Sequence, residues 1–194
     1  MTLKYQLKFY DYWHISSGLS AGAKLDSTVI KDSNSLPYVA GKIIKGLSRE
    51  MAVLLENCTF VNHCFGGSSE DGKNGKQKDP CYDDEAKNKS GVCYFTNATL
   101  DETMVQQITT NNLQDNLYDV IASTKIDNST GVAEDNSLRE IEVVVPLTLA
   151  GEIRDIPDET SFTQMTKALK MIKRMGLNRN RGLGRCEFIV EGLK

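Results

Sequence analysis

Residues 11–50 read DYWHISSGLSAGAKLDSTVIKDSNSLPYVAGKIIKGLSRE and combine a strand end, a polar loop and a helix. After Pro37, apolar residues recur at helical spacing, namely Ala40, Ile43, Ile44, Leu47, Met51, Leu54 and Leu55. Lys42, Lys45 and Arg49 are spaced three and four residues apart on another face. The pattern predicts an amphipathic helix that ends near Asn57, with one packing face and one cationic face.

The start of this helix is a candidate phosphate site, because its first turn contains Gly41 and Lys42. Unpaired backbone N–H groups and the helix dipole favour an anion at a helix N-terminus. A core helix with a solvated lysine face is the alternative interpretation. The loop before the helix carries Asp26, which can place a carboxylate beside a bound phosphate.

The remaining core elements follow from periodicity. Leu3, Tyr5, Leu7 and Phe9 alternate with polar residues and predict a first strand. Further strands are expected over residues 91–100, 141–149 and 186–191, and a second amphipathic helix over 162–175 ends at Gly176. The order strand, helix, strand, strand, helix, strand predicts an α+β fold with a ferredoxin-like (RRM-like) βαββαβ core.

Two stretches interrupt this core. Residues 57–90 are rich in Gly, Lys, Asp and Ser, which predicts an insertion without regular structure. Residues 101–139 carry few apolar side chains, and the turn chemistry within 126–133 predicts a hairpin there. We expect residues 1–194 to form one domain with these two additions.

The cysteines gather in or beside the first of these stretches. Cys58, His63, Cys64 and Cys81 surround a polar loop in a chain that we expect to be cytosolic, which predicts a structural zinc site with these four ligands. Zinc would order a segment that has too few apolar residues to order itself. Free structural thiols and a redox role are the alternatives that the irregular spacing leaves open.

Charge is unevenly distributed along a chain whose formal net charge is −3. The segment from Lys167 to Arg185 holds seven Lys or Arg and no acid, whereas Asp101 to Glu159 holds thirteen acids against three bases. A local basic stripe is enough for phosphate binding. The chain has no run of about 18 apolar residues and begins with an alternating strand, so we expect a cytoplasmic protein that does not bind membranes.

The basic segment ends in GLNRNRGLGR, residues 176–185. Glycines permit close backbone approach, and Arg179 and Arg181 offer bidentate donors to phosphate. A structural turn is the alternative to a phosphate contact at this loop.

Several of these motifs together resemble the repeat-associated mysterious proteins (RAMPs) of CRISPR systems. The motifs are His14 to Gly22 with Asp26, Asp32 to Glu50, Phe65-Gly66, Gly91 to Leu100, Thr130 to Ala133, Leu138 to Glu140, and Gly176 to Arg185. More narrowly, the chain is similar to the crRNA-binding backbone subunits of type III effector complexes, which act in antiviral defence. The resemblance implies that crRNA, target RNA and other CRISPR-associated subunits, or fused copies of the same fold, are partners.

The resemblance also implies roles for individual residues. Residues expected to contact RNA are His14, Gly41, Lys42, Lys45, Arg49, Arg179, Arg181, Gly182 and Gly184. For His14, the alternative is a packing role beside Trp13. In the resembling subunits an aspartate at the position of Asp26 promotes metal-dependent cleavage of target RNA, and the excursion at 101–139 forms a thumb that wedges into the guide–target duplex. Asp26 would hold Mg²⁺ or another divalent metal, or orient the ribose 2′-hydroxyl. The zinc expectation also fits, since some of these subunits carry zinc fingers.

Three other interpretations remain open at this point. The chain can be a structural backbone subunit without an active site, or a crRNA-processing RAMP endoribonuclease that uses a histidine as general acid or base. An unrelated zinc-dependent interaction domain would bind no RNA.

Overall fold

The computed structural model describes residues 1–19, 25–55, 57–68 and 79–191. The helices are α1 (Gly41–Val53), α2 (Cys58–Phe65), α3 (Glu102–Thr110) and α4 (Glu159–Met171), with a 3-10 helix η1 (Gln114–Leu117). The strands are β1 (Leu3–Phe9), β2 (Tyr94–Phe95), β3 (Tyr118–Ser123), β4 (Arg139–Val144), β5 (Thr148–Arg154) and β6 (Cys186–Val190). Part of the predicted insertion, residues 69–78, and Gly22 of the loop motif lie outside the described residues.

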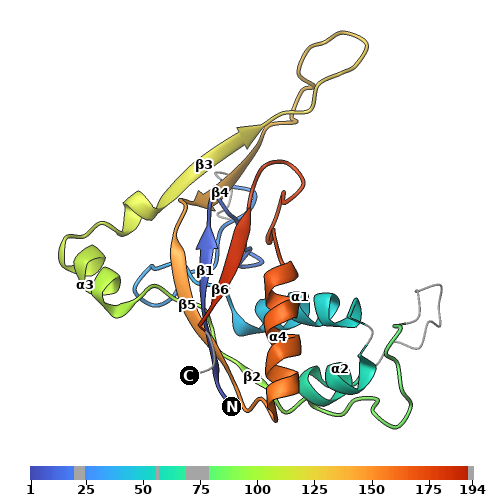
Figure 1. Cartoon of the computed structure of the whole chain (residues 1–194). Helices are drawn as coiled ribbons and strands as arrows, with labels where there is room; N and C mark the ends of the chain where they lie inside the picture. Colours follow the sequence, from blue (N-terminus) through green and yellow to red (C-terminus); the bar gives the residue numbers. More distant parts are fainter. Residues whose placement is uncertain (20–24, 56, 69–78, 192–194) are drawn as a thin grey trace.

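Four strands form an antiparallel sheet in the order β2-β5-β1-β6 (Figure 1). In the central strand β1, Leu7 lies opposite Leu149 of β5 on one side and Phe188 of β6 on the other. The residues of β1 alternate between buried and exposed along its whole length, as the sequence predicts. The result is a mixed α and β architecture in which one face of the sheet is covered.

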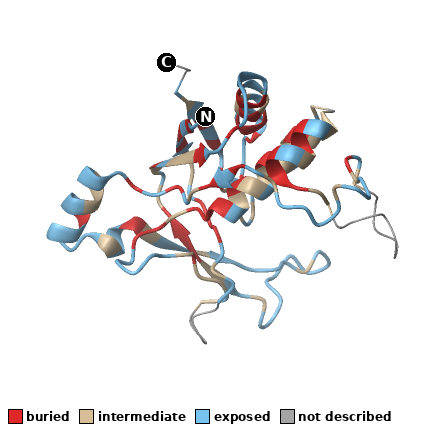
Figure 2. Ribbon diagram, turned by 90° about the horizontal axis from the view of Figure 1, so that it is seen from below, coloured by how far each residue is buried: buried red, intermediate tan, exposed pale blue. Residues whose placement is uncertain are grey.

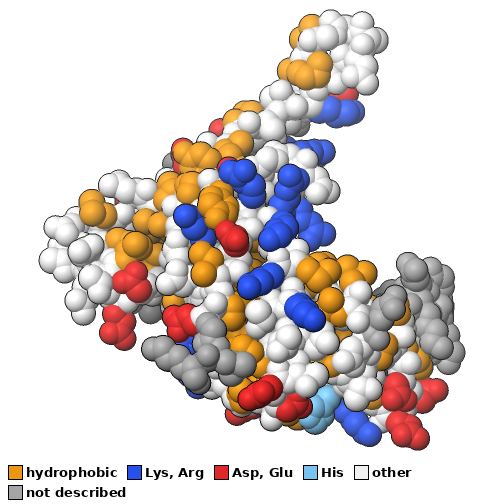
Figure 3. All heavy atoms as spheres, in the orientation of Figure 1, with side chains coloured by type: hydrophobic (Ala, Val, Ile, Leu, Met, Phe, Trp, Pro, Cys, Tyr) orange, Lys and Arg blue, Asp and Glu red, His pale blue; other side chains and the backbone are white. Residues whose placement is uncertain are grey.

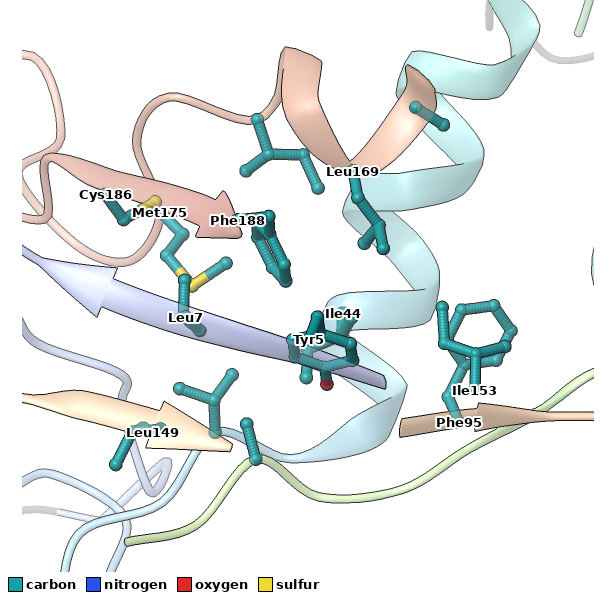
Figure 4. Packing of buried hydrophobic residues seen from close by; sticks show 14 of the residues in the cluster. Tyr5, Leu7, Ile44, Phe95, Leu149, Ile153, Leu169, Met175, Cys186 and Phe188 are labelled. Atoms are coloured by element: carbon teal, nitrogen blue, oxygen red, sulfur yellow. The ribbon is translucent and has the colours of Figure 1, made fainter. Parts of the chain in front are cut away.

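Helices α1 and α4 cover that face and pack against each other (Figure 1). The Asp158 carboxylate caps α4 by accepting the Ser161 N–H at 2.7 Å. The close-up in Figure 4 shows the side chains that fill the space between sheet and helices, among them Tyr5, Leu7, Ile44, Leu149, Ile153, Leu169 and Phe188. Each large apolar side chain buried there contributes about 1.5–3 kcal/mol to folding.

The strands β3 and β4 pair in a separate hairpin that projects from the core (Figure 1). Tyr118 lies opposite Val144 at its base, and Ile126 and Ala133 form an isolated bridge near its tip. The predicted hairpin at 126–133 is therefore confirmed as the tip of a longer one. Figure 2 shows that buried residues concentrate between helices and sheet, whereas the outer hairpin is exposed.

The structure differs from the sequence prediction around residues 53–65. The first helix ends at Val53, and a second helix, α2, follows within the stretch predicted to be irregular. The Asn57 side chain caps α2 by accepting the Phe60 N–H at 3.1 Å, and Phe60 and Phe65 are buried. The glycine content of the later part of the stretch concealed this short, apolar helix.

Two predicted strands also differ. The strand expected over 141–149 is divided, because Pro146 lies between β4, which belongs to the hairpin, and β5, which belongs to the main sheet. Of the strand expected over 91–100, only β2 pairs regularly, while Ala98 and Thr99 form isolated bridges. The sequence marked these extended segments but not which sheet each one joins.

Candidate nucleic-acid interface

The glycine-rich segment, residues 176–185, forms a loop that is fixed at both ends to the segment after β1. The Leu177 N–H donates to the His14 carbonyl at 2.9 Å, and the Gly184 N–H donates to the Tyr12 carbonyl at 2.8 Å. Between these two anchors, Arg179 and Arg181 are exposed. The loop therefore presents two guanidinium groups from a backbone that is held at its base.

Two of the loop glycines serve close backbone packing. Gly176 and Gly184 have φ values of +92° and +70°, and a Cβ there would lie 2.3 Å from the His14 carbonyl oxygen and 2.0 Å from the Met175 carbonyl oxygen. Gly182 differs, because its φ is +89° but a Cβ would meet no atom within 4 Å. Only Gly182 leaves open space beside the backbone, next to Arg181.

A basic stripe, defined as the seven cations of the segment 167–185, lies across α4 and this loop. All of its members are exposed: Lys167, Lys170, Lys173, Arg174, Arg179, Arg181 and Arg185. Figure 3 shows Lys and Arg side chains gathered over the loop and the C-terminal end of α4, at the base of the hairpin. Such a concentration attracts the RNA backbone even though the whole chain carries a net charge of −3.

The start of α1 is more enclosed than the sequence suggests. Gly41 is buried, and its N–H donates to the Asn97 side-chain oxygen at 2.9 Å. A Cβ at Gly41 would lie 2.2 Å from the Phe95 carbonyl oxygen. The glycine is thus explained by its contact with β2, and its N–H is already used within the protein.

The cations of α1 fall into two groups. Lys42 is exposed and Lys45 is partly exposed, and neither forms an ion pair with another described residue. Arg49 instead donates to the Asp79 carboxylate at 2.7 Å, with both side chains largely buried. Of the three predicted phosphate contacts on α1, Arg49 is therefore engaged by a carboxylate from the following segment.

Asp79 is the partner that sequence reasoning missed. Its other carboxylate oxygen accepts the Cys81 N–H at 2.8 Å. Partial burial would raise the pKa of Asp79, but hydrogen bonds from the Cys81 N–H and the Arg49 guanidinium outweigh that effect and hold this pKa below its usual value. The residue remains ionised and fixes the segment after residue 78 to α1.

Asp26 lies at the base of the hairpin. Its side chain is exposed, yet one carboxylate oxygen accepts the Glu140 N–H at 2.8 Å while the Asp26 N–H donates to the Glu140 carbonyl at 2.9 Å. Ser27 continues this contact as an isolated parallel bridge to Ile141 of β4. The backbone around Asp26 is therefore tied to β4, and the second carboxylate oxygen has no hydrogen bond to a described residue.

His14 is fully buried and connects three elements. Its Nδ1 lies 2.5 Å from the Glu142 carbonyl oxygen and therefore donates to it, and its Nε2 lies within hydrogen-bonding distance of the Ser27 hydroxyl, at 3.0 Å. The His14 carbonyl accepts from Leu177 of the glycine-rich loop. His14 thus positions the Asp26 loop, β4 and the glycine-rich loop, and its ring has no exposed edge for RNA.

Glu142 is a buried acid that the sequence analysis did not single out. Its carboxylate accepts from the Lys31 ammonium at 2.7 Å and from the Val29 N–H at 3.0 Å. The Lys31 ammonium also lies 3.7 Å from the centroid of the Tyr118 ring. The sequence did contain a signal for this site, because an acidic residue inside a predicted strand is buried only when a partner neutralises its charge.

The four predicted zinc ligands do not come together. Cys58 and Cys81 form a disulfide, His63 is exposed, and Cys64 is buried beside Cys93. Across the described ranges, no group of three or more His, Cys, Asp or Glu side chains could hold a metal ion. Because disulfide sulfurs are not thiolates, this arrangement does not fit the expected site, and zinc binding stays a prediction for a reduced chain.

Comparison with known proteins places the chain among related folds. A family model described as the RAMP superfamily matches residues 7–187. One similar solved structure is described as the cryo-EM structure of the type III-B Cmr-beta bound to cognate target RNA, with a TM-score of 0.71, 9% identity, and coverage of 98% of this chain and 97% of that chain. Another is the apo state of type III-B Cmr-beta, with a TM-score of 0.64, 10% identity and the same coverage.

Two further findings complete the comparison. No curated protein matches the chain significantly. Within the part of the chain that the structure describes, no helix is long and apolar enough to cross a membrane. At identities near one tenth, the likeness to the solved structures shows the fold alone.

Proposed function

Because the chain belongs to the RAMP superfamily, we propose that it binds crRNA as a backbone subunit of a type III CRISPR effector complex. The observation that carries this proposal is the exposed basic stripe across α4 and the glycine-rich loop. Similar folds occur in type III-B complexes, one of them bound to target RNA. Target RNA and other effector subunits are accordingly the proposed partners.

The chemistry of the stripe suits the RNA backbone rather than base sequence. Arginine donors form bidentate pairs with phosphate, and each neutralised phosphate releases counterions. In RNA-guided complexes the protein grips the guide backbone while base pairing reads the target. A subunit of this kind binds any guide sequence with similar affinity.

The architecture supports the same assignment. We propose that the core is ferredoxin-like, because α1 and α4 cover one face of a sheet ordered β2-β5-β1-β6. The hairpin β3–β4, whose first strand and tip lie within residues 101–139, is the proposed thumb, since it projects beyond the core (Figure 1). Residues 57–90, including α2, form the proposed insertion.

Fluorescence anisotropy with single-stranded RNA tests the proposed RNA binding by the basic stripe. Replacing Arg179 and Arg181 by Ala should weaken binding for every RNA sequence and lower the slope of log affinity against log salt by about 1.4, since each phosphate contact on a single strand contributes about 0.7. The matched control is Lys87→Ala with Lys89→Ala, a pair with the same spacing that is also exposed but lies outside the stripe. An unchanged salt slope in the arginine variant would overturn the proposal.

Cleavage of target RNA at Asp26 is the catalytic part of the proposal. The exposed carboxylate retains one oxygen without a described partner, which fits a single-carboxylate metal ligand but not a complete protein site. A bound divalent metal would polarise a phosphate oxygen or activate the attacking hydroxyl. Asp26 itself can orient the ribose 2′-hydroxyl, and the hydrogen bond from Glu140 holds it in place.

A cleavage assay in the assembled complex separates the alternatives. Asp26→Asn keeps an oxygen that can accept the Glu140 N–H but removes the charge, so guide and target binding should remain while cleavage is lost. Equal cleavage by wild type and Asp26→Asn would make the chain a non-catalytic scaffold. Processing of free repeat RNA by a histidine is disfavoured at His14, because both of its ring nitrogens are buried and bonded.

A further inference from the structure

A groove lies beside the glycine-rich loop, at the point where α4 has ended and β6 begins. It is lined by Tyr10, Lys173, Arg174, Arg185, Cys186 and Glu187 and has a volume of about 510 Å³. This volume lies within the range of small-ligand pockets. Three of the six lining residues are cations and one is an acid, so the groove is suited to an anion.

The fold holds two arginines of the groove close together although their charges repel. Arg174 and Arg185 lie directly opposite each other as an isolated antiparallel bridge. Like charges in opposed positions repel and destabilise the pairing. Arg185 is partly neutralised by Asp11 at 3.2 Å, but Arg174 has no acidic partner among the described residues and donates only to the Arg179 carbonyl. An anion between the two arginines would remove this repulsion.

An aromatic ring borders the same groove. Tyr10 is 39% exposed, and its hydroxyl donates to the Glu187 carboxylate at 2.6 Å. The Lys8 ammonium and the Arg185 guanidinium lie 5.0 and 5.4 Å from the centre of this ring. The ring is therefore held in position next to the cations, and aromatic rings and guanidinium planes are the groups on which unpaired nucleobases stack.

From this geometry we propose that the groove binds one nucleotide of single-stranded RNA, with its phosphate between Arg174, Arg185 and Lys173 and its base stacked on Tyr10. The groove adjoins the glycine-rich loop through the contact of Arg174 with Arg179. An RNA strand that crosses Arg179 and Arg181 can thus continue into it. The inference rests on the proposed RNA-binding function and adds a stacked position to it.

The test uses the full chain and a single-stranded RNA that carries one 2-aminopurine, whose fluorescence falls when the base stacks. Wild type should quench the probe on binding. Tyr10→Phe should keep the quenching, whereas Tyr10→Ala should abolish it and weaken binding about tenfold. Lys173→Ala with Arg174→Ala should weaken binding by about tenfold or more, and Lys87→Ala with Lys89→Ala should leave it unchanged.

The outcomes separate this inference from the proposed function. If the groove variants bind like wild type while Arg179→Ala with Arg181→Ala loses affinity, the groove is not a nucleotide site but RNA binding stands. If none of these variants changes binding, both proposals fail. Quenching that persists in Tyr10→Ala would overturn the stacked position itself.

Discussion

Helix α1 and the glycine-rich loop at 176–185 have similar sequence chemistry and different structural settings. Each combines glycine with cations, and each reads as a phosphate site from sequence. At α1 the glycine is packed against β2, its N–H is bonded to Asn97, and Arg49 is paired with Asp79. In the loop, Arg179 and Arg181 remain exposed.

This difference shows that a glycine next to a cation has two physical explanations. The absence of a side chain allows another backbone to approach, and that backbone can belong to a ligand or to the protein itself. In both cases the sequence shows only that a glycine is adjacent to a cation. Only the tertiary neighbours, here Phe95 and Asn97, decide which explanation applies at Gly41.

The largest expected effect comes from adding a methyl group at Gly41. A methyl group there would meet the Phe95 carbonyl oxygen at 2.2 Å, so Gly41→Ala should destabilise the protein by about 3 kcal/mol. Gly46 provides the control in the same helix, because a Cβ there meets nothing within 4 Å. Gly46→Ala should stabilise by about 0.5–1 kcal/mol. Urea denaturation of both variants checks this. If Gly41→Ala were as stable as wild type, the start of α1 would not be closed by β2 and could again be considered as a phosphate site.

The second-largest effect concerns the segment around Asp79 and Cys81, whose Asp79 carboxylate binds Arg49. The disulfide between Cys58 and Cys81 closes a loop with a sequence separation of 23, so Cys58→Ser with Cys81→Ser should lower stability by about 3 kcal/mol under oxidising conditions. Thiol titration of denatured wild type should find three thiols, those of Cys64, Cys93 and Cys186. Five thiols together with one equivalent of zinc would instead establish the metal site predicted from sequence.

Elements with strong periodicity were predictable from the sequence. The alternation in β1 and the apolar stripes of α1 and α4 each reflect one buried face, and the structure confirms that these elements exist. The predicted end of the second helix at Gly176 was wrong, since α4 ends at Met171 and Ile172 is extended. The tip of the hairpin was predictable from local turn chemistry between residues 126 and 133. In all of these cases the information lies within a few neighbouring residues.

The unpredicted features depend on partners distant in sequence. Asp79 is 30 residues from Arg49, and Glu142 is 111 residues from Lys31. His14 was expected near RNA, but contacts with Ser27 and Glu142 place it in the interior. A single sequence records that these side chains are polar, whereas the choice between solvent, ligand and internal partner is made by the fold.

A smaller effect is expected when the ion pair on α1 is broken. Arg49→Ala should lower stability by about 1–2 kcal/mol, between the values for exposed and buried pairs, because Asp79 loses its partner in a partly buried setting. RNA affinity should change much less than in Arg179→Ala with Arg181→Ala. Thermal denaturation and RNA titration on the same preparations measure both quantities. Equal losses of RNA affinity in the two variants would abolish the distinction between helix and loop.

The smallest effect is the pH dependence that Asp79 contributes. The Cys81 N–H and the Arg49 guanidinium hold its folded-state pKa below the unfolded value of about 4. A group with a depressed folded pKa stabilises the protein above its unfolded pKa, and this stabilisation is lost as pH falls through the folded pKa. Wild type should therefore lose stability on acidification below about pH 4 more steeply than Asp79→Asn, which cannot titrate and should be less stable at neutral pH. Lys42→Ala, which removes an exposed cation of the same helix, should lose stability on acidification as steeply as wild type. If Asp79→Asn and wild type show parallel curves, the carboxylate does not hold Arg49 in solution, and α1 regains a third cation for RNA.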